Sequence, residues 1–542
     1  MRIRSELNKV SLGVLFVCLL GCAPENTTSP TIDEQVQISN GLIRGAVGAD
    51  GLKQYQGIPY AAAPIGSLRW APPAPAASWP GVRDATSIGP ACPQPVPAEG
   101  SFYGGTELQT DEDCLFLNVW TRAEQEDANL PVMVWIHGGA LVTGSGGEYP
   151  GALLTSKGVV LVTINYRLGR FGFHAHPDLS AESAQGASGN QGLRDQIAAL
   201  HWVRENIEKF GGNPENVTIF GESAGSLSVS LLQASPLAKG LFHRVIGQSG
   251  GAFQPMWYRD RTTTYAESAE QTGQKFVQAL IPDNEAPSLT ALRELPAEHI
   301  LNVFESDPAF SNYDALAIVD GDVIPDEVAT LFKAGKQADV PVLIGSNANE
   351  GTTFLPYFTP VFGEGSSGFQ AYAAATLKEV NDEIGTLYPY DDPEESWINL
   401  FSDVLFTYPM RTWAQSMDSV SSEAYLYWFT WSPPIENSEH FRAFHAGEIG
   451  YVFGNVDLFG AVPTAEDHMF SDYMARVWTQ FAKTGNPNGK DLALWPAYDS
   501  ELETYMELGL ETGQKTQLRL GQMDLIRRAW QIRRDLSTTT VN

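Results

Sequence analysis

The chain has 542 residues, of which 43% are hydrophobic and 18% are charged, so it has enough apolar material for a large core and lacks the polar bias of a disordered protein. With 64 acidic against 34 basic residues, its formal net charge is -30 at pH 7. This charge excludes nucleic acid as an expected partner, because both would be strongly negative.

The first 22 residues have the pattern of an export signal. Basic residues precede an apolar run at 10–20, which is too short to span a bilayer as a helix. The signal ends in LLGC, which resembles a bacterial lipobox, and we expect lipidation of its last residue, Cys22. Ala23 after this cysteine indicates, by resemblance to Gram-negative lipoproteins, an outer-membrane or periplasmic location with a lipid anchor. Cleavage by an ordinary signal peptidase, followed by secretion, is the alternative.

Residues 23–32 are rich in Pro, Glu, Asn, Thr and Ser and show no hydrophobic period, which predicts a flexible tether. The chain from 33 to 535 contains no obvious internal repeat and no comparable low-complexity stretch, which predicts a single domain.

The cysteines also fit export. Cys18 and Cys22 belong to the signal, which leaves Cys92 and Cys114 as a pair. An oxidising compartment favours a disulfide between these two residues over two free thiols.

Short apolar runs bounded by turn residues predict buried strands of a central parallel sheet. These runs lie at 132–136, 159–164, 217–220, 340–344 and 424–429. Between the second and third runs, apolar residues spaced by three or four predict a helix over 193–210, which the GGNP sequence at 211–214 ends. The order strand, helix, strand predicts a doubly wound α/β architecture.

The strand at 217–220 leads directly into GESAG at 221–225, and a helix-like segment follows at 226–232. This is the G-x-S-x-G pattern in the strand–turn–helix context of the nucleophile elbow of α/β-hydrolases. The glycines permit a tight turn, and the helix dipole stabilises negative charge at the serine. We therefore predict that Ser223 is a nucleophile.

A serine hydroxyl needs a histidine base, and the base needs a carboxylate to orient it; in this fold they follow the serine in the order acid, histidine. The histidines after Ser223 are His243, His299, His440, His445 and His468. His445 lies just before an apolar segment, whereas His440 lies in a polar segment typical of an exposed loop.

The sequence alone leaves more than one candidate for the acid. Glu350 follows the predicted strand at 340–344, at the carboxyl end where ligands bind in α/β sheets. Asp320 and Asp322 are alternatives that the spacing does not exclude.

A glycine-rich segment, HGGA at 137–140, directly follows the predicted strand at 132–136 and matches the oxyanion loop of such enzymes. The expected backbone N–H donors to an oxyanion are those of Gly138, Gly139 and Ala224.

Beyond these motifs, the chain resembles the type-B carboxylesterases, the family that includes cholinesterases and bacterial esterases active on p-nitrobenzyl esters. The resemblance extends over nearly the whole chain after the signal. Besides the motifs above, it is carried by GIPYA at 57–61, LRW at 68–70, EDCLFLN at 112–118, NYRLG at 165–169, GNQGLRDQ at 189–196, QSG at 248–250, GNPN at 485–488 and WP at 495–496.

This resemblance implies an α/β-hydrolase fold, with a central, mostly parallel sheet flanked by helices and with large insertions. Carried over residue by residue, it implies a triad of Ser223, Glu350 and His445. It also implies that Cys92 pairs with Cys114.

The resemblance further implies that Glu222 and Ser249 support the site from just outside the triad. For Glu222, a carboxylate that merely faces a helix N-terminus is the alternative.

The implied activity is hydrolysis of neutral carboxylic esters with short to medium acyl chains, through an acyl-enzyme intermediate. The expected partner is a small-molecule ester, and neither a cofactor nor a metal is implied. A lipase acting on longer-chain lipid esters and a non-catalytic binding or adhesion protein are the alternatives. All three triad positions are filled, which argues against a non-catalytic protein.

Choline esters are not expected as substrates. Cholinesterases carry a tryptophan in the loop that resembles the one between Cys92 and Cys114, and a tryptophan face binds quaternary ammonium well. In this chain the loop contains only Phe102 and Tyr103 as aromatic residues.

Residues 525–536 predict a basic amphipathic helix that docks on the core with its arginines in solvent. A role at a membrane surface is the alternative.

Overall fold

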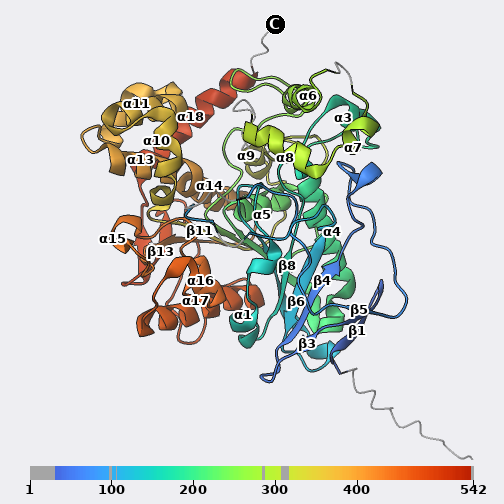
Figure 1. The fold of residues 1–542 in the computed structure, drawn as a ribbon. Coiled ribbons are helices and arrows are strands. Elements are labelled where there is room, and N and C mark those ends of the chain that lie inside the picture. Colours follow the sequence, from blue (N-terminus) through green and yellow to red (C-terminus); the bar gives the residue numbers. More distant parts are fainter. Residues whose placement is uncertain (1–30, 97–100, 105–106, 284–286, 307–315, 539–542) are drawn as a thin grey trace, which may run out of the picture.

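The computed structural model describes residues 31–96, 101–104, 107–283, 287–306 and 316–538 (Figure 1). The predicted signal and Cys22 lie outside the described residues. Ile32, predicted as the last residue of the tether, is buried, and its N–H donates to the Glu124 carbonyl at 2.9 Å. Packed structure therefore begins before residue 33, because this apolar side chain joins the core.

The main sheet has 11 strands in the order β14-β13-β12-β11-β10-β9-β7-β8-β6-β4-β3, and a separate 3-stranded sheet has the order β1-β2-β5. Neighbouring strands from β13 through β8 in that order are parallel, and the strands at both edges are antiparallel. The strands are β1 Gln35–Ile38, β2 Gly41–Arg44, β3 Ala46–Val47, β4 Lys53–Pro59, β5 Val82–Asp84, β6 Phe116–Thr121, β7 Leu130–Ile136, β8 Val160–Ile164, β9 Gly212–Glu222, β10 Arg244–Gln248, β11 Val342–Asn347, β12 Ala424–Phe429, β13 Thr504–Leu508 and β14 Gly513–Thr516.

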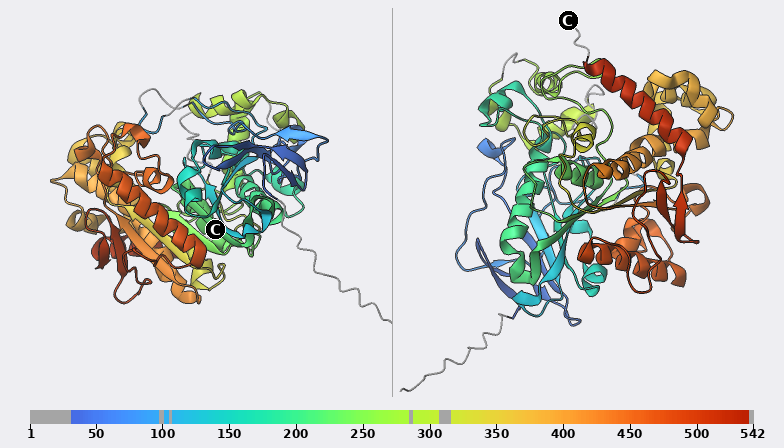
Figure 2. Two further views of the ribbon diagram at one scale, coloured as in Figure 1. Left: turned by 90° about the horizontal axis from the view of Figure 1, so that it is seen from below. Right: turned by 180° about the vertical axis from the view of Figure 1, so that it is seen from behind.

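Helices cover both faces of this sheet (Figures 1 and 2). They are α1 Ala152–Ser156, α2 Gly169–Gly172, α3 Pro177–Glu182, α4 Gln191–Asn206, α5 Ala224–Ala234, α6 Ala269–Leu280, α7 Leu289–Arg293, α8 Ala297–Ser306, α9 Val328–Lys333, α10 Leu355–Phe362, α11 Gly365–Thr376, α12 Asn381–Leu387, α13 Pro393–Ser402, α14 Tyr408–Ser416, α15 Ser438–Phe441, α16 Ile449–Phe453, α17 Ala465–Thr484 and α18 Leu520–Thr538. Within the described part of the chain, none of them is both long and apolar enough to cross a membrane.

The two faces of the sheet bury two separate cores, because successive side chains of a strand point to opposite faces. In β7, Val132 and Val134 pack with residues of α4 and α5, whereas Met133 and Trp135 pack with residues of α16 and α17. Strands that are buried on both faces have continuous apolar sequences, which is why the runs in the sequence predicted them.

The C-terminal helix docks as predicted. Met523, Ile526 and Trp530 of α18 are buried in a cluster with residues of α11 and α13. The predicted exposure of its arginines is wrong for Arg533, which pairs with Glu379 at 2.7 Å. The apolar face therefore packs within the fold, and at least one arginine is used to fix the helix to its neighbours.

Candidate active site

The predicted nucleophile lies at a sharp turn between the central strand β9 and α5. Ser223 has a φ of 56° and a ψ of -120°, a strained combination for a residue with a side chain. Its N–H donates to the Gln248 carbonyl at 2.8 Å, which fixes the turn to β10. At Gly225, a Cβ atom would lie 1.9 Å from the Ile136 carbonyl oxygen, so only glycine fits this position.

The predicted base and acid lie in contact. His445 Nδ1 is 2.7 Å from Glu350 Oε2, and both side chains are buried. Glu350 begins a 3-10 helix, Glu350–Thr353, just after the carboxyl end of β11, and its Oε1 accepts a hydrogen bond from the Asn347 N–H at 2.7 Å. This arrangement fixes the tautomer and orientation of the imidazole.

The other ring nitrogen of the imidazole faces a second carboxylate. His445 Nε2 lies 3.2 Å from Oε1 of Glu222, the last residue of β9. Among the described residues, no hydrogen bond joins the Ser223 hydroxyl to this nitrogen. Glu222 therefore does more than face a helix dipole, because its side chain also contacts the imidazole.

Burial and charge act in opposite directions on this pair. Burial disfavours the imidazolium, but the charge of Glu222 and the hydrogen bond and charge of Glu350 outweigh it and raise the pKa of His445 to about 9. Burial raises the pKa of the Glu222 carboxyl well above its usual range. The protonation of each of these two side chains therefore depends on the charge of the other.

A glycine loop lies against the nucleophile. At Gly138, a Cβ atom would lie 2.9 Å from Glu222 Oε2 and 3.2 Å from Ser223 Cβ, so the backbone of this loop approaches the serine closely. The N–H groups of Gly138, Gly139 and Ala224 donate no hydrogen bond to any described residue. This leaves them available to an oxygen atom of a ligand.

Aromatic rings surround the imidazole. The ring centroids of Phe406, Phe354 and Tyr103 lie 4.5, 5.2 and 6.2 Å from that of His445. Tyr103 belongs to the loop that the Cys92–Cys114 disulfide closes, as predicted. Aromatic rings, as well as the buried carboxylates, therefore contact the imidazole.

Comparison with known proteins identifies the family. Residues 32–526 match the model of the Carboxylesterase family. This chain belongs to the carboxylesterase family. A para-nitrobenzyl esterase of Bacillus subtilis (strain 168) is 38% identical over 486 residues, which cover 87% of this chain and 94% of that protein. A liver carboxylesterase of Sus scrofa is 36% identical over 522 residues, covering 89% of this chain and 90% of the relative.

Solved structures agree with this assignment. A thermophilic PNB esterase superposes with a TM-score of 0.79 at 35% sequence identity, covering 91% of this chain and 99% of that chain. The predicted α/β-hydrolase fold and the predicted type-B family are therefore confirmed, and the chain is a carboxylic-ester hydrolase.

In this carboxylesterase, the alternative candidates for the acid and the base make contacts elsewhere. The Asp320 carboxylate accepts hydrogen bonds from the N–H groups of Asp322 and Ile324, and the Asp322 carboxylate pairs with Arg194. His440 is exposed beside Glu394 at 3.8 Å. None of these contacts involves His445 or Ser223.

Ser249 follows β10 with a φ of 56°, next to the elbow that Gln248 fixes. Its buried hydroxyl has no hydrogen-bond partner among the described residues. The implied support of the esterase site by this side chain is therefore not visible as a hydrogen bond.

The sequence analysis missed a third buried carboxylate of the esterase site. Glu448 accepts hydrogen bonds from Gln248 Nε2 at 2.9 Å and from Asn347 Nδ2 at 2.6 Å. Its place three residues after His445, with the apolar segment just beyond, was the only signal in the sequence. Burial, and next the charge of Glu350, raise the pKa of this carboxyl.

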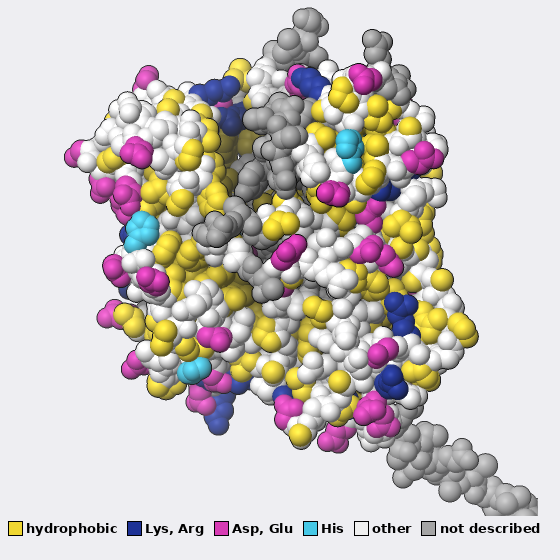
Figure 3. All heavy atoms as spheres, viewed as in Figure 1, with side chains coloured by type: hydrophobic (Ala, Val, Ile, Leu, Met, Phe, Trp, Pro, Cys, Tyr) yellow, Lys and Arg dark blue, Asp and Glu magenta, His cyan; other side chains and the backbone are white. Residues whose placement is uncertain are grey.

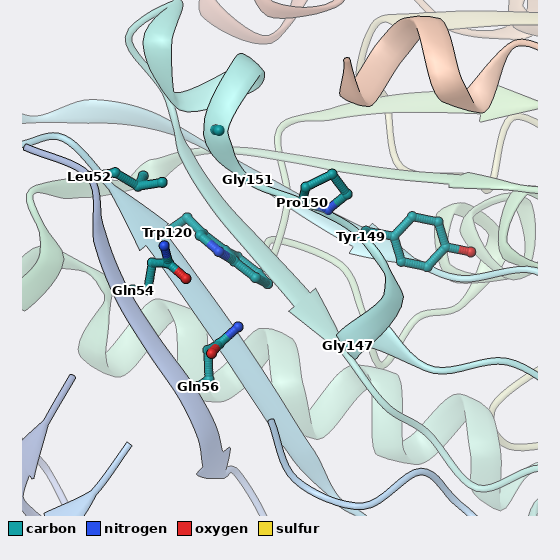
Figure 4. Close-up of a pocket in the computed structure, with 9 residues that line it drawn as sticks. Leu52, Gln54, Gln56, Trp120, Gly147, Tyr149, Pro150 and Gly151 are labelled. Atoms are coloured by element: carbon teal, nitrogen blue, oxygen red, sulfur yellow. The ribbon is translucent and has the colours of Figure 1, made fainter. Parts of the chain in front are cut away.

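A cavity of about 250 Å³ lies away from these residues (Figure 4). It opens beside β4 and β6 and is lined by Leu52, Gln54, Gln56, Trp120 and residues 147 and 149–152. None of the predicted site residues of the esterase lines it.

Proposed function

We propose that this esterase cleaves its substrate through an acyl-enzyme, with Ser223 as the nucleophile, His445 as the base and Glu350 as the acid that orients it. The observation that carries the proposal is the contact of 2.7 Å between His445 Nδ1 and Glu350 Oε2, beside a serine held at a strained turn. Strain of this kind is typical of functional positions.

The reaction has two halves. His445 takes the hydroxyl proton of Ser223 as its oxygen attacks the ester carbonyl, and then gives that proton to the departing alcohol. In the second half, water loses a proton to His445, attacks the acyl-enzyme and releases the acid.

The tetrahedral intermediates carry a negative oxygen, which we assign to the N–H groups of Gly138, Gly139 and Ala224. These groups donate to no other described residue, and Gly138 lies close to the Ser223 side chain. Donors that are already in place stabilise the developing charge without reorganisation.

The preferred substrates are neutral esters with short or medium acyl chains, aryl esters included. The rings of Phe354, Phe406 and Tyr103 favour an apolar substrate beside the imidazole. Choline esters are poor substrates, because the loop between Cys92 and Cys114 offers no tryptophan to a quaternary ammonium. Phe102 of this loop packs against Phe441 and Phe459, and Tyr103 is its ring that contacts His445.

Covalent labelling tests the nucleophile. An organophosphonate probe should label the wild-type enzyme once per chain, and the labelling should be absent from Ser223→Ala. Labelling of the alanine variant at the same rate would place the nucleophile elsewhere.

Acyl-chain length separates this proposal from its nearest alternative. The esterase should give a higher kcat/KM for p-nitrophenyl butyrate than for the palmitate. A preference for palmitate that increases above the solubility limit of the ester would indicate a lipase.

The proposal for location is that Cys22 is lipidated and that the enzyme is anchored at the periplasmic side of the outer membrane or in the periplasm. It rests on the signal pattern and on the LLGC sequence at 19–22. Secretion without lipid is the competing outcome.

A further inference from the structure

The tip of the disulfide loop contacts the histidine of the site directly. The Tyr103 ring meets the His445 ring edge to face. The Tyr103 hydroxyl donates a hydrogen bond to the His445 carbonyl at 2.9 Å, and it lies 2.7 Å from Thr353 Oγ1. A single phenol group therefore has two polar partners on separate chain segments.

These two segments are the ones that carry the proposed base and the proposed acid. Thr353 is the last residue of the 3-10 helix that Glu350 begins, and the other partner is the backbone of His445 itself. Tyr103 lies 250 residues before Thr353 and 342 before His445, so it joins two parts of the site from a third part of the chain.

Described residues at the ends of this loop and next to Tyr103 are held by other contacts. The disulfide joins Cys92 and Cys114, both buried. At the tip, the Phe102 ring packs 5.1 Å from Phe444 and 5.5 Å from Phe459. The phenol is therefore anchored by covalent and apolar contacts that do not depend on the hydrogen bonds it makes.

We propose that Tyr103 is a positioning residue that keeps the His445 imidazole aligned with the Glu350 carboxylate. Tyr103 acts through the backbone of His445 and the helical turn that Glu350 begins, rather than by touching the acyl group. The hydrogen bond between Nδ1 and Oε2 depends on both distance and angle, so a small shift of either segment weakens it. The proposal rests on the proposed roles of His445 and Glu350.

The test is Tyr103→Phe, which removes the hydroxyl and keeps the ring. We expect kcat for a p-nitrophenyl ester to fall by about 10- to 100-fold, the size of loss that small misplacements cause, while KM changes little. We also expect the acid limb of the pH profile to move to lower pH, because a weaker bond to Glu350 stabilises the imidazolium less.

The chain offers a matched control in Tyr357→Phe. Tyr357 of α10 is 45% exposed, and its hydroxyl lies 2.9 Å from Ser101 Oγ in the same loop. This variant also removes a phenol hydroxyl that contacts the loop, yet it leaves the bonds of Tyr103 in place. Its kcat and pH profile should equal those of the wild type.

A second variant, Thr353→Val, removes one partner of the phenol and leaves the other. It should also lower kcat. The fold-loss of kcat in the double variant with Tyr103→Phe should be smaller than the product of the two single fold-losses.

Three results would overturn the inference. One is a lower melting temperature of Tyr103→Phe with unchanged kcat and pH profile, which would mean that the hydroxyl only anchors the loop. Another is a raised KM at unchanged kcat, which would mean contact with the substrate. The third is an equal loss in Tyr357→Phe. Full activity of Ser223→Ala or His445→Ala would instead refute the proposed function.

Discussion

Three buried carboxylates lie around one imidazole, and each has different partners. Glu350 accepts from His445 and from a backbone N–H, and Glu448 accepts from two side-chain amides. Glu222 Oε1 lies near His445 Nε2 but has no hydrogen bond within the described chain. Glu222 is therefore the carboxylate whose protonation most directly changes the charge on the imidazole.

Glu222→Gln should move the acid limb of the kcat/KM profile to lower pH. The negative charge of Glu222 stabilises the imidazolium and so raises the pKa of His445. Without that charge the pKa falls, and the unprotonated base persists into more acidic solution. The profile is measured with an uncharged p-nitrophenyl ester.

Glu439→Gln, which removes an exposed charge in α15, is the control for a change in net charge and should leave the profile unchanged. A shift of the Glu222→Gln limb to higher pH would contradict the assigned direction.

His445→Ala should lower kcat by roughly 10³-fold or more, because the serine loses its base. His440→Ala is the matched control, since its ring lies exposed on α15 and contacts Glu394. Turnover of the two purified variants is compared after circular dichroism has shown that both are folded to the same extent. Loss of activity in the His440 variant alone would mean that the base is misassigned.

Among the secondary-structure elements, the disulfide loop links stability to the site. A disulfide that joins residues 22 apart contributes roughly 3 kcal/mol in the chain-entropy model. Replacing Cys92 and Cys114 by serine should lower the melting temperature, and it should also lower kcat, because the loop carries Tyr103. Thiol titration of the native wild-type protein should find neither thiol free.

Sequence patterns predicted five strands of the sheet, β7, β8, β9, β11 and β12, and missed others, including β6, whose six residues are all buried. The predicted run at 424–429 coincides with β12, because Ala424–Phe429 is apolar throughout. β10 was not predicted, since its five residues begin with Arg244 and end with Gln248. The predicted helix at 193–210 begins earlier, at Gln191, and its last turn, Ile207–Phe210, is a 3-10 helix.

The site was predictable where it depends on local sequence. Ser223 and the glycine loop can be recognised because a strand, a turn and a helix adjoin in the chain. The choice of Glu350 over Asp320 came from family resemblance rather than from spacing. Glu448 and Tyr103 were not assigned these roles, because their contacts join segments hundreds of residues apart and depend on the closed fold.

At the scale of the whole molecule, the chain is strongly acidic, with a formal net charge of -30 at pH 7. Acidic side chains are scattered over the face seen in Figure 3 and do not form a single patch. The site itself is lined by aromatic rings near His445. The rings that contact the imidazole are therefore apolar, although the chain as a whole is acidic.

Lipidation predicts a simple fractionation result. The full-length product should enter the detergent phase, and Cys22→Ser should release the enzyme or block its processing. Mass spectrometry of the mature N-terminus checks the modification directly. An unmodified terminus at Pro24 would show simple secretion.

The point where the chain enters the fold has a consequence for which molecules can reach the enzyme. Ile32 bonds to Glu124, shortly before β7 begins, and Leu130 of β7 lies beside Gly212 at the start of β9. Ser223 follows the other end of β9, whose 11 residues span about 36 Å at roughly 3.3 Å each. In a protein anchored by lipid at Cys22, the reactive serine would lie at the opposite end of β9 from the point where the described chain enters the fold. Esters dissolved in the surrounding fluid could then reach Ser223 without entering the leaflet that holds the anchor.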